Sequence, residues 1–170
     1  MNYSKNKISI SKIVVIITAI ILIIILFLIL FLNIRIYKIN GTSMSPTLIE
    51  DEYVLSYKSF YNRGDIIAFH YKDNVMIKRI IGLPNDIIDI DEDGNIYIND
   101  ELLNEPYLPN KAKGDIEITL PYKVPSNKYF VLGDNRADSL DSRNIHISSI
   151  SENDIIGTVK VSLIPLKKIS

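Results

Sequence analysis

Two serines compete for the role of nucleophile near the start of this 170-residue chain. Ser43 lies two residues after Gly41, and a glycine lets the backbone turn tightly or approach a substrate closely. Ser45 precedes Pro46, and a Ser-Pro pair is typical of the first turn of a helix, with Ser as the cap. Helix capping therefore accounts for Ser45, whereas Ser43 has no such role and is the better candidate for chemistry.

A lysine in a predicted strand is the candidate base. Side chains alternate between the faces of a strand, so Met76, Lys78 and Ile80 share one face of residues 75–81. A solvated lysine is protonated at neutral pH, but desolvation lowers a lysine pKa by up to about 3–5 units. Lys78 is therefore either a general base or a lysine whose charged end reaches solvent from an edge strand.

A third segment combines an apolar strand with a dense polar loop. Residues 129–132 are apolar, and eight of the ten residues from Asp134 to Arg143 have polar or charged side chains. Such loops often carry functional groups on a rigid scaffold, although Asp, Asn and Ser also build ordinary turns.

An apolar segment precedes all three candidates. Residues 13–32 carry no charge and one polar side chain, Thr18, and as a helix they span roughly 30 Å, about the hydrocarbon thickness of a bilayer. A cleaved signal peptide would have a shorter apolar core and a small-x-small site, which residues 33–38 lack. We therefore predict a single transmembrane anchor at 13–32, between a basic tail at 1–12 and an extracytoplasmic domain at 33–170.

The distribution of charge favours a cytoplasmic N-terminus and a domain on the outer face of the cell membrane. Lys5, Lys7 and Lys12 precede the anchor without any acid, whereas Arg35 and Lys38 follow it. All 20 acidic residues come after the anchor, and a mildly acidic domain is a poor nucleic-acid binder. The absence of cysteine excludes disulfides, thiolate metal sites and a cysteine nucleophile.

The residues after the anchor suffice for one modest domain, which we predict to be mainly β, a small coiled or barrel-like sheet. Two hairpins are expected, one around residues 72–74 and one at Asp93-Gly94. The predicted strands are residues 53–57, 65–71, 75–81, 88–90, 96–98, 128–132 and 155–161, with 118–120 as a further short candidate.

Four segments resemble the conserved boxes of the type I signal peptidases (leader peptidases), in the same order and behind a similar anchor. The pattern Gly-x-Ser-Met-x-Pro-Thr-Leu at 41–48 resembles the nucleophile box of that family, and the segment at 78–86 resembles its base box. The segments at 63–69 and 133–143 resemble the two other boxes, and the chain has the length of the short Gram-positive-like form.

The resemblance implies a membrane-anchored serine endopeptidase that cleaves signal peptides from exported preproteins at the membrane surface. In such an enzyme Ser43 would form the acyl-enzyme, and Lys78 would be its general base. The backbone N–H of Ser43 would donate to the oxyanion. The partners implied are signal peptides and the lipid bilayer, and no metal or cofactor is implied.

The resemblance also gives roles to four supporting residues. Ser139 would hydrogen-bond and orient the lysine amine. Asp141 would pair with Arg143 and Arg79 and so brace the site.

Two departures from the family pattern leave other functions open. Ala137 stands where the family has an acid, and Ile145-His146 stands where it has an aromatic residue and glycine. One alternative is a catalytically inactive, membrane-tethered β-domain adaptor. The other is a Ser/His hydrolase that uses His70 or His146.

Overall fold

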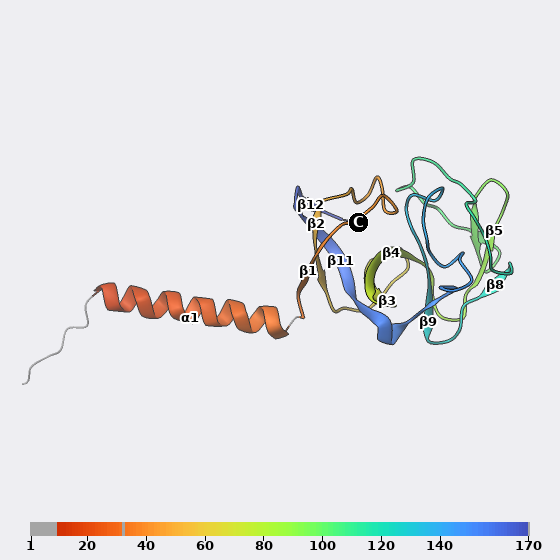
Figure 1. Ribbon diagram of the computed structural model, residues 1–170. Helices are drawn as coiled ribbons and strands as arrows, with labels where there is room; N and C mark the ends of the chain where they lie inside the picture. Colours follow the sequence, from red (N-terminus) through yellow and green to blue (C-terminus); the bar gives the residue numbers. More distant parts are fainter. Residues whose placement is uncertain (1–9, 32, 170) are drawn as a thin grey trace, which may run out of the picture. The chain divides into compact units, whose positions relative to one another are not determined.

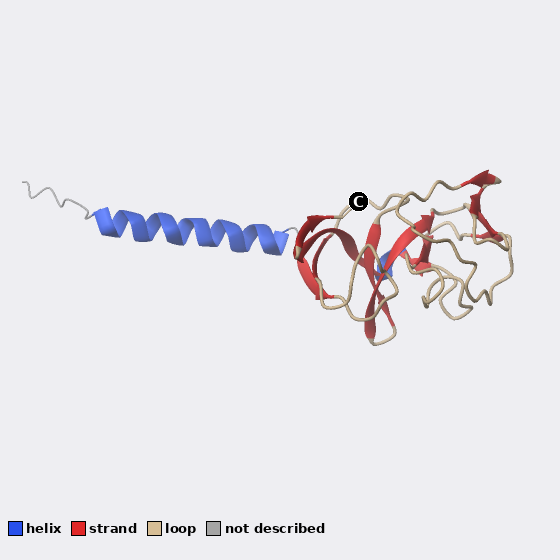
Figure 2. Ribbon diagram, turned by 90° about the horizontal axis from the view of Figure 1, so that it is seen from above, coloured by secondary structure: helices blue, strands red, loops and turns tan. Residues whose placement is uncertain are grey.

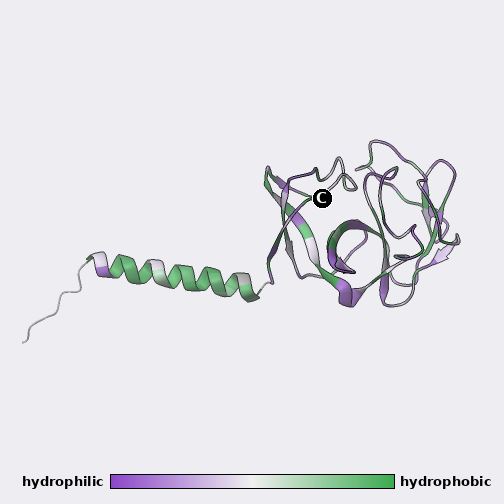
Figure 3. Ribbon diagram, viewed as in Figure 1, coloured by the Kyte–Doolittle hydropathy of each residue, from purple (hydrophilic) through white to green (hydrophobic). Residues whose placement is uncertain are grey.

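The computed structural model describes residues 10–31 and 33–169, which fall into two units that divide between Ile34 and Arg35. The first unit contains helix α1, Ile10–Phe31 (Figure 1). The hydroxyl of Thr18 donates to the Val15 carbonyl at 2.9 Å, so this polar side chain is satisfied within the helix. The helix is long and apolar enough to cross a membrane, and Figure 3 shows it mostly in the hydrophobic colour.

The helix begins three residues before the predicted anchor, so that Lys12 belongs to its first turn. Lys5 and Lys7 of the predicted basic tail lie outside the described residues, as does Leu32, the last residue of the predicted anchor.

The second unit is mainly β, as predicted, and contains two antiparallel sheets (Figure 2). The larger sheet has the order β1-β2-β11-β3-β4-β9-β10, with β12 paired to β11, and the smaller has the order β7-β6-β5-β8. The strands of the larger sheet are β1 (Arg35–Lys38), β2 (Tyr53–Tyr57), β3 (Ile66–Tyr71), β4 (Asn74–Gly82), β9 (Lys128–Leu132), β10 (Ile150–Ser151), β11 (Ile155–Ile164) and β12 (Leu166–Lys168). Those of the smaller sheet are β5 (Ile87–Ile90), β6 (Ile96–Ile98), β7 (Glu101–Leu102) and β8 (Tyr122–Lys123), and a 3₁₀ turn, Glu152–Asp154, precedes β11.

Both predicted hairpins are present. Strands β3 and β4 pair up to Tyr71 and Asn74, and Lys72 in the turn between them has a φ of 52°. In the β5–β6 hairpin, Gly94 has a φ of 77°, which favours glycine. The carboxylate of Asp91 closes this turn by accepting the N–H groups of residues 93 and 95 at 3.0 and 2.8 Å.

The prediction of a strand at 118–120 is wrong, because the N–H of Ile118 donates to the Arg143 carbonyl and the next strand is β8, Tyr122–Lys123. The strands that the sequence did not predict have only two to four residues, as in β1, β7, β8, β10 and β12. Such short strands form because a partner strand lies alongside, so their own residue pattern is a weak guide.

Strand β4 is fixed by packing on several sides. Ile80 is buried in one apolar cluster and Ile81 in another, while Ile77 packs at the margin of a third. An element held by three clusters has little freedom to shift, so a side chain carried by β4 is presented in a fixed place.

Candidate active site

Ser43 lies in a compact turn that follows β1. Gly41 begins this turn with a φ of 83°, in the left-handed region. The Leu48 N–H donates to the Met44 carbonyl at 2.9 Å, and the side chains of both residues are buried in the core. The turn that presents Ser43 is therefore fastened to the core by its own apolar side chains.

The helix-capping role predicted for Ser45 is not observed. Residues 43–47 form consecutive turns, and no helix begins at Pro46 in the described chain. The backbone N–H of Ser45 instead donates to the Thr42 carbonyl at 2.9 Å. Ser45 thus contributes to the turn through its backbone.

Lys78 is buried on β4, where only 3% of its surface is exposed. It lies directly opposite Ile67 of β3, and Met76 and Ile80 pack in the same apolar cluster as Ile67. The predicted apolar face around the lysine is therefore present. With so little of its surface exposed, the side chain does not extend into solvent as that of a snorkelling lysine would.

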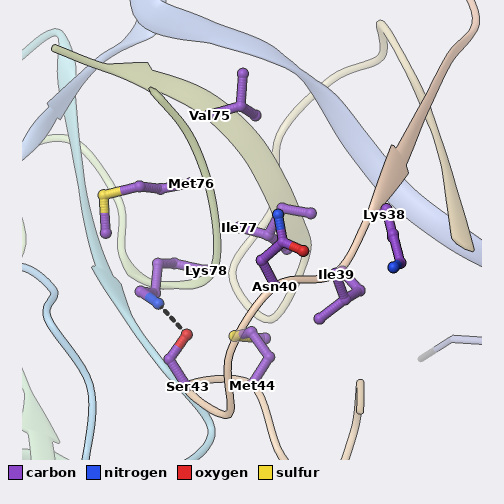
Figure 4. A pocket seen from close by; sticks show the side chains of 9 residues that line it. All are labelled: Lys38, Ile39, Asn40, Ser43, Met44, Val75, Met76, Ile77 and Lys78. Atoms are coloured by element: carbon purple, nitrogen blue, oxygen red, sulfur yellow. Dashed lines mark hydrogen bonds between the residues drawn. The ribbon is translucent and has the colours of Figure 1, made fainter. Parts of the chain in front are cut away.

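The amine of Lys78 meets the hydroxyl of Ser43 at the turn. The two are joined by a hydrogen bond with a Nζ–Oγ distance of 2.5 Å (Figure 4). Burial lowers the pKa of Lys78 from its ordinary value of 10.5 to about 8, while the charges of Asp141 and Asp134 raise it and that of Arg143 lowers it. A lysine with this pKa is partly neutral near physiological pH and can accept a proton from the serine.

A cleft of about 170 Å³ opens beside this pair, between the end of β1 and the start of β4 (Figure 4). Both strands present an unpaired edge here, because β1 is the last strand of its sheet and β4 pairs with β9 only from Arg79 onwards. The cleft is lined by Lys38, Ile39, Asn40, Ser43, Met44, Val75, Met76, Ile77 and Lys78. Polar and apolar side chains thus line it together, and the hydroxyl and the amine lie in its wall.

The polar loop after β9 holds the backbone of the Ser43 turn. The Asn135 N–H donates to the Ser43 carbonyl at 3.0 Å, and the Thr42 hydroxyl donates to the Asp138 carboxylate at 3.3 Å. A Cβ on Gly133 would lie 2.4 Å from the Ser43 carbonyl oxygen and 2.2 Å from the Ser139 hydroxyl oxygen. Only glycine at position 133 allows the loop and the turn to approach this closely.

Ser139 lies beside Gly133, near the turn, but the structure contains no hydrogen bond between its hydroxyl and Lys78. The Ser139 Oγ atom is buried and has no hydrogen-bond partner among the described residues. A buried hydroxyl without a partner is uncommon, so this group is available to a neighbour that moves or to a bound substrate.

Two buried arginine–carboxylate pairs brace the loop, and one of them differs from the expectation. Arg143 makes a forked pair with Asp141, with N–O distances of 2.9 and 2.8 Å, as expected. Arg79 makes its forked pair with Asp134, at 2.9 and 2.8 Å, and not with Asp141. The loop places Asp134 beside β4, and the guanidinium of Arg79 therefore pairs with this carboxylate.

Three of the buried charged residues that received no role from the sequence lie in or against the polar loop: Asp134, Arg136 and Glu105. The first two lie in the polar loop, where the density of charged side chains could have pointed to them. Glu105 lies in the irregular stretch after β7, and no local pattern marks it as part of the site.

The two histidines do not take part in this arrangement. His70 and His146 are both exposed, and the side chain hydrogen-bonded to Ser43 is Lys78. Within residues 10–31 and 33–169, no group of three or more His, Cys, Asp or Glu side chains is placed to hold a metal ion. The geometry therefore favours a serine–lysine pair over a Ser/His hydrolase.

Comparisons with known proteins agree in one family. The family model described as signal peptidase, peptidase S26, matches residues 9–164. Signal peptidase I U of Bacillus subtilis (strain 168) is 42% identical over 146 residues, which cover 76% of this chain and 75% of the relative. Signal peptidase I of Bacillus amyloliquefaciens is 40% identical over 146 residues, covering 78% and 77%. A crystal structure of a signal peptidase I from Enterococcus faecalis V583 has a TM-score of 0.50 and 33% identity, and covers 59% of this chain and 97% of that one.

We expect the amine of Lys78 to titrate with a midpoint of about 8, well below the ordinary 10.5 of a lysine, because burial disfavours its charged form. The measurement is an NMR pH titration with ¹³C-labelled lysine, in which Lys78→Ala identifies the signal. Asp141→Asn should lower the midpoint further, since the charge of Asp141 raises it. A Lys78 signal that titrates near 10.5 would show that the amine is solvated.

Proposed function

Because this chain belongs to the signal peptidase family, peptidase S26, we propose that it cuts signal peptides from exported preproteins with Ser43 as nucleophile and Lys78 as general base. Members of this family cleave signal peptides from preproteins, and the family match includes both residues. The observation that carries the proposal is the 2.5 Å contact between the Ser43 hydroxyl and the buried, pKa-lowered amine of Lys78.

The reaction begins when the neutral amine of Lys78 accepts the proton of the Ser43 hydroxyl. The Ser43 oxygen attacks the carbonyl carbon of the scissile peptide bond, and the ammonium of Lys78 then protonates the departing amine. This step breaks the C–N bond and leaves an ester on Ser43. Lys78 next takes a proton from water as the water oxygen attacks the ester carbon. The C–O bond to Ser43 then breaks, and the ammonium of Lys78 returns the proton to the serine oxygen, which releases the carboxylic acid product.

The oxyanion formed by this attack needs a donor close to Ser43. The backbone N–H of Ser43 donates to no protein acceptor within the described chain, so it is available to the developing charge. Residue 41 is a glycine, which offers no hydroxyl as a second donor. The side chain of residue 41 therefore adds no second donor.

The substrate is proposed to bind as an extended peptide between the unpaired edges of β1 and β4. Backbone N–H and C=O groups at such edges can pair with an added strand. The cleft between them has a volume of about 170 Å³, which gives room for side chains of the bound peptide. Signal peptides with small residues at the first and third positions before the cut fit such a site, because alternate side chains of a strand point the same way.

The location of the reaction follows from the proposed division of the chain. Residues 1–12 are proposed as a cytoplasmic tail, 13–32 as the anchor, and 33–170 as a peptidase domain on the outer face of the membrane. Ser43 comes only 11 residues after Leu32, so the cut is made near the membrane surface. The lipid bilayer is in this sense a partner of the enzyme.

Replacing Ser43 with alanine should abolish cleavage, whereas Ser45→Ala should keep most of it. Loss of the nucleophile from a catalytic unit of this kind costs on the order of 10⁶ in rate, while Ser45 makes only a backbone contact in the turn. The assay is turnover of a leader peptide by the detergent-solubilised protein, with circular dichroism to show that both variants fold. An active Ser43→Ala together with an inactive Ser45→Ala would reverse the assignment, and full activity in both would exclude either serine.

In intact cells that express the chain with a C-terminal epitope, added protease should digest residues 33–170 without lysis. The reason is the lysine-rich segment before α1, which favours a cytoplasmic N-terminus. A cytoplasmic marker protein must stay intact in the same sample. Protection of the epitope until the cells are lysed would contradict the proposed orientation.

A further inference from the structure

The irregular stretch between β7 and β8, residues 103–121, contacts the polar loop through a buried glutamate. Glu105 is only 5% exposed, and its carboxylate accepts from the guanidinium of Arg136 at 2.5 and 3.2 Å. The Tyr107 hydroxyl donates to the same carboxylate at 2.6 Å, and the Tyr107 ring lies 3.9 Å from the guanidinium of Arg79. Glu105 and Tyr107, which lie outside the recognised motifs, thus contact two arginines: Arg136 in the polar loop and Arg79, which follows Lys78.

We propose that Glu105 is a positioning residue for Ser43, a role that rests on the function proposed above. Glu105 fixes Arg136, whose Nε donates to the Gly133 carbonyl at 3.0 Å. Gly133 is in close contact with the Ser43 carbonyl, and the Asn135 N–H donates to that carbonyl at 3.0 Å. The position of the Ser43 backbone, which supplies the nucleophile and the oxyanion donor, therefore depends on a carboxylate some 60 residues away in sequence.

The Arg136–Glu105 pair is buried, and this makes the loop sensitive to the loss of either charge. The side chains of Arg136 and Glu105 are 2% and 0% exposed, so neither charge can turn to water if the other is lost. A buried charge without its partner is strongly destabilising, so we expect the segment that carries it to shift until the charge reaches water or another partner. For Arg136 that segment is the loop from Gly133 to Asn135. A displacement of about 1 Å in a catalytic geometry can cost roughly 10²-fold in rate.

The other half of the stretch holds the far end of the same loop. Arg143 Nη1 donates to the Lys113 carbonyl at 2.8 Å, and the Glu117 N–H donates to the Arg143 carbonyl at 2.9 Å. The Glu117 carboxylate accepts from Asn144 Nδ2 at 2.8 Å and from the Ile145 N–H at 3.2 Å. The loop is therefore clamped at both ends by residues 103–121, with Glu105 at the end nearer Ser43.

The experiment compares Glu105→Gln with Glu52→Gln in the detergent-solubilised full chain. Both variants exchange a buried glutamate for the amide of the same shape beside a basic side chain, but Glu52 pairs with Lys167 of β12 and lies outside the polar loop and the four boxes. We expect Glu105→Gln to lower kcat by about 10²-fold with KM changed less than about twofold, because only the reacting geometry is disturbed. Glu52→Gln should keep the kcat of the wild type.

A folded Glu105→Gln with the kcat of the wild type would overturn the proposal, as would an equal loss of kcat in Glu52→Gln. If Glu105→Gln fails to fold, Glu105→Asp takes its place, since it keeps the charge but is too short for the forked pair, and a normal kcat in that variant overturns the proposal as well. Ser43→Ala serves as the third arm. If it remains active the proposed function itself fails, whereas an inactive Ser43→Ala with an unimpaired Glu105 variant refutes only the positioning role.

Discussion

The burial of one lysine amine beside a serine hydroxyl is the interaction on which this site depends. Removing Lys78 from water lowers its pKa from 10.5 to about 8, a difference on the order of 3 kcal/mol against the folded, protonated state. This cost is fully present below pH 8, where both the folded and the unfolded chain bind the proton, and it is relieved as the pH rises from about 8 to 10.5. The fold must therefore supply enough packing around β4 to keep a costly group in place, and three apolar clusters do so.

The surroundings of Lys78 also contain several charged side chains, and these must not cancel the lowering of its pKa by burial. Asp141 and Asp134 raise the pKa of Lys78, and each is engaged by its own arginine in a forked pair. These arginines keep the carboxylates turned toward guanidinium groups, so desolvation remains the largest influence on the amine. A third pair, Arg136 with Glu105, joins the loop to a stretch that has no regular structure of its own. Charge pairing thus stabilises the loop geometry while the lysine stays without a counter-ion.

Local pattern predicted much of the fold and the two central residues. Strands such as 53–57 and 128–132 were found to the residue, because alternation and turn residues report a half-buried strand directly. A glycine-led turn marked Ser43 as a candidate, and an apolar strand face marked Lys78. The family resemblance is what implied that the two act together as nucleophile and base. Long-range pairing could not be read in this way: the choice of Asp134 by Arg79 depends on how two distant segments meet.

If a neutral Lys78 is the base, its titration governs the pH dependence of kcat/KM on a leader peptide. This quantity reports the pKa values of the uncomplexed enzyme. We expect activity to be lost as pH falls through about 8, because Lys78 becomes protonated, and we expect His70→Ala and His146→Ala to leave this midpoint unchanged. A midpoint near 6.5, the ordinary value of histidine, that disappears in one of the two histidine variants would contradict a lysine base.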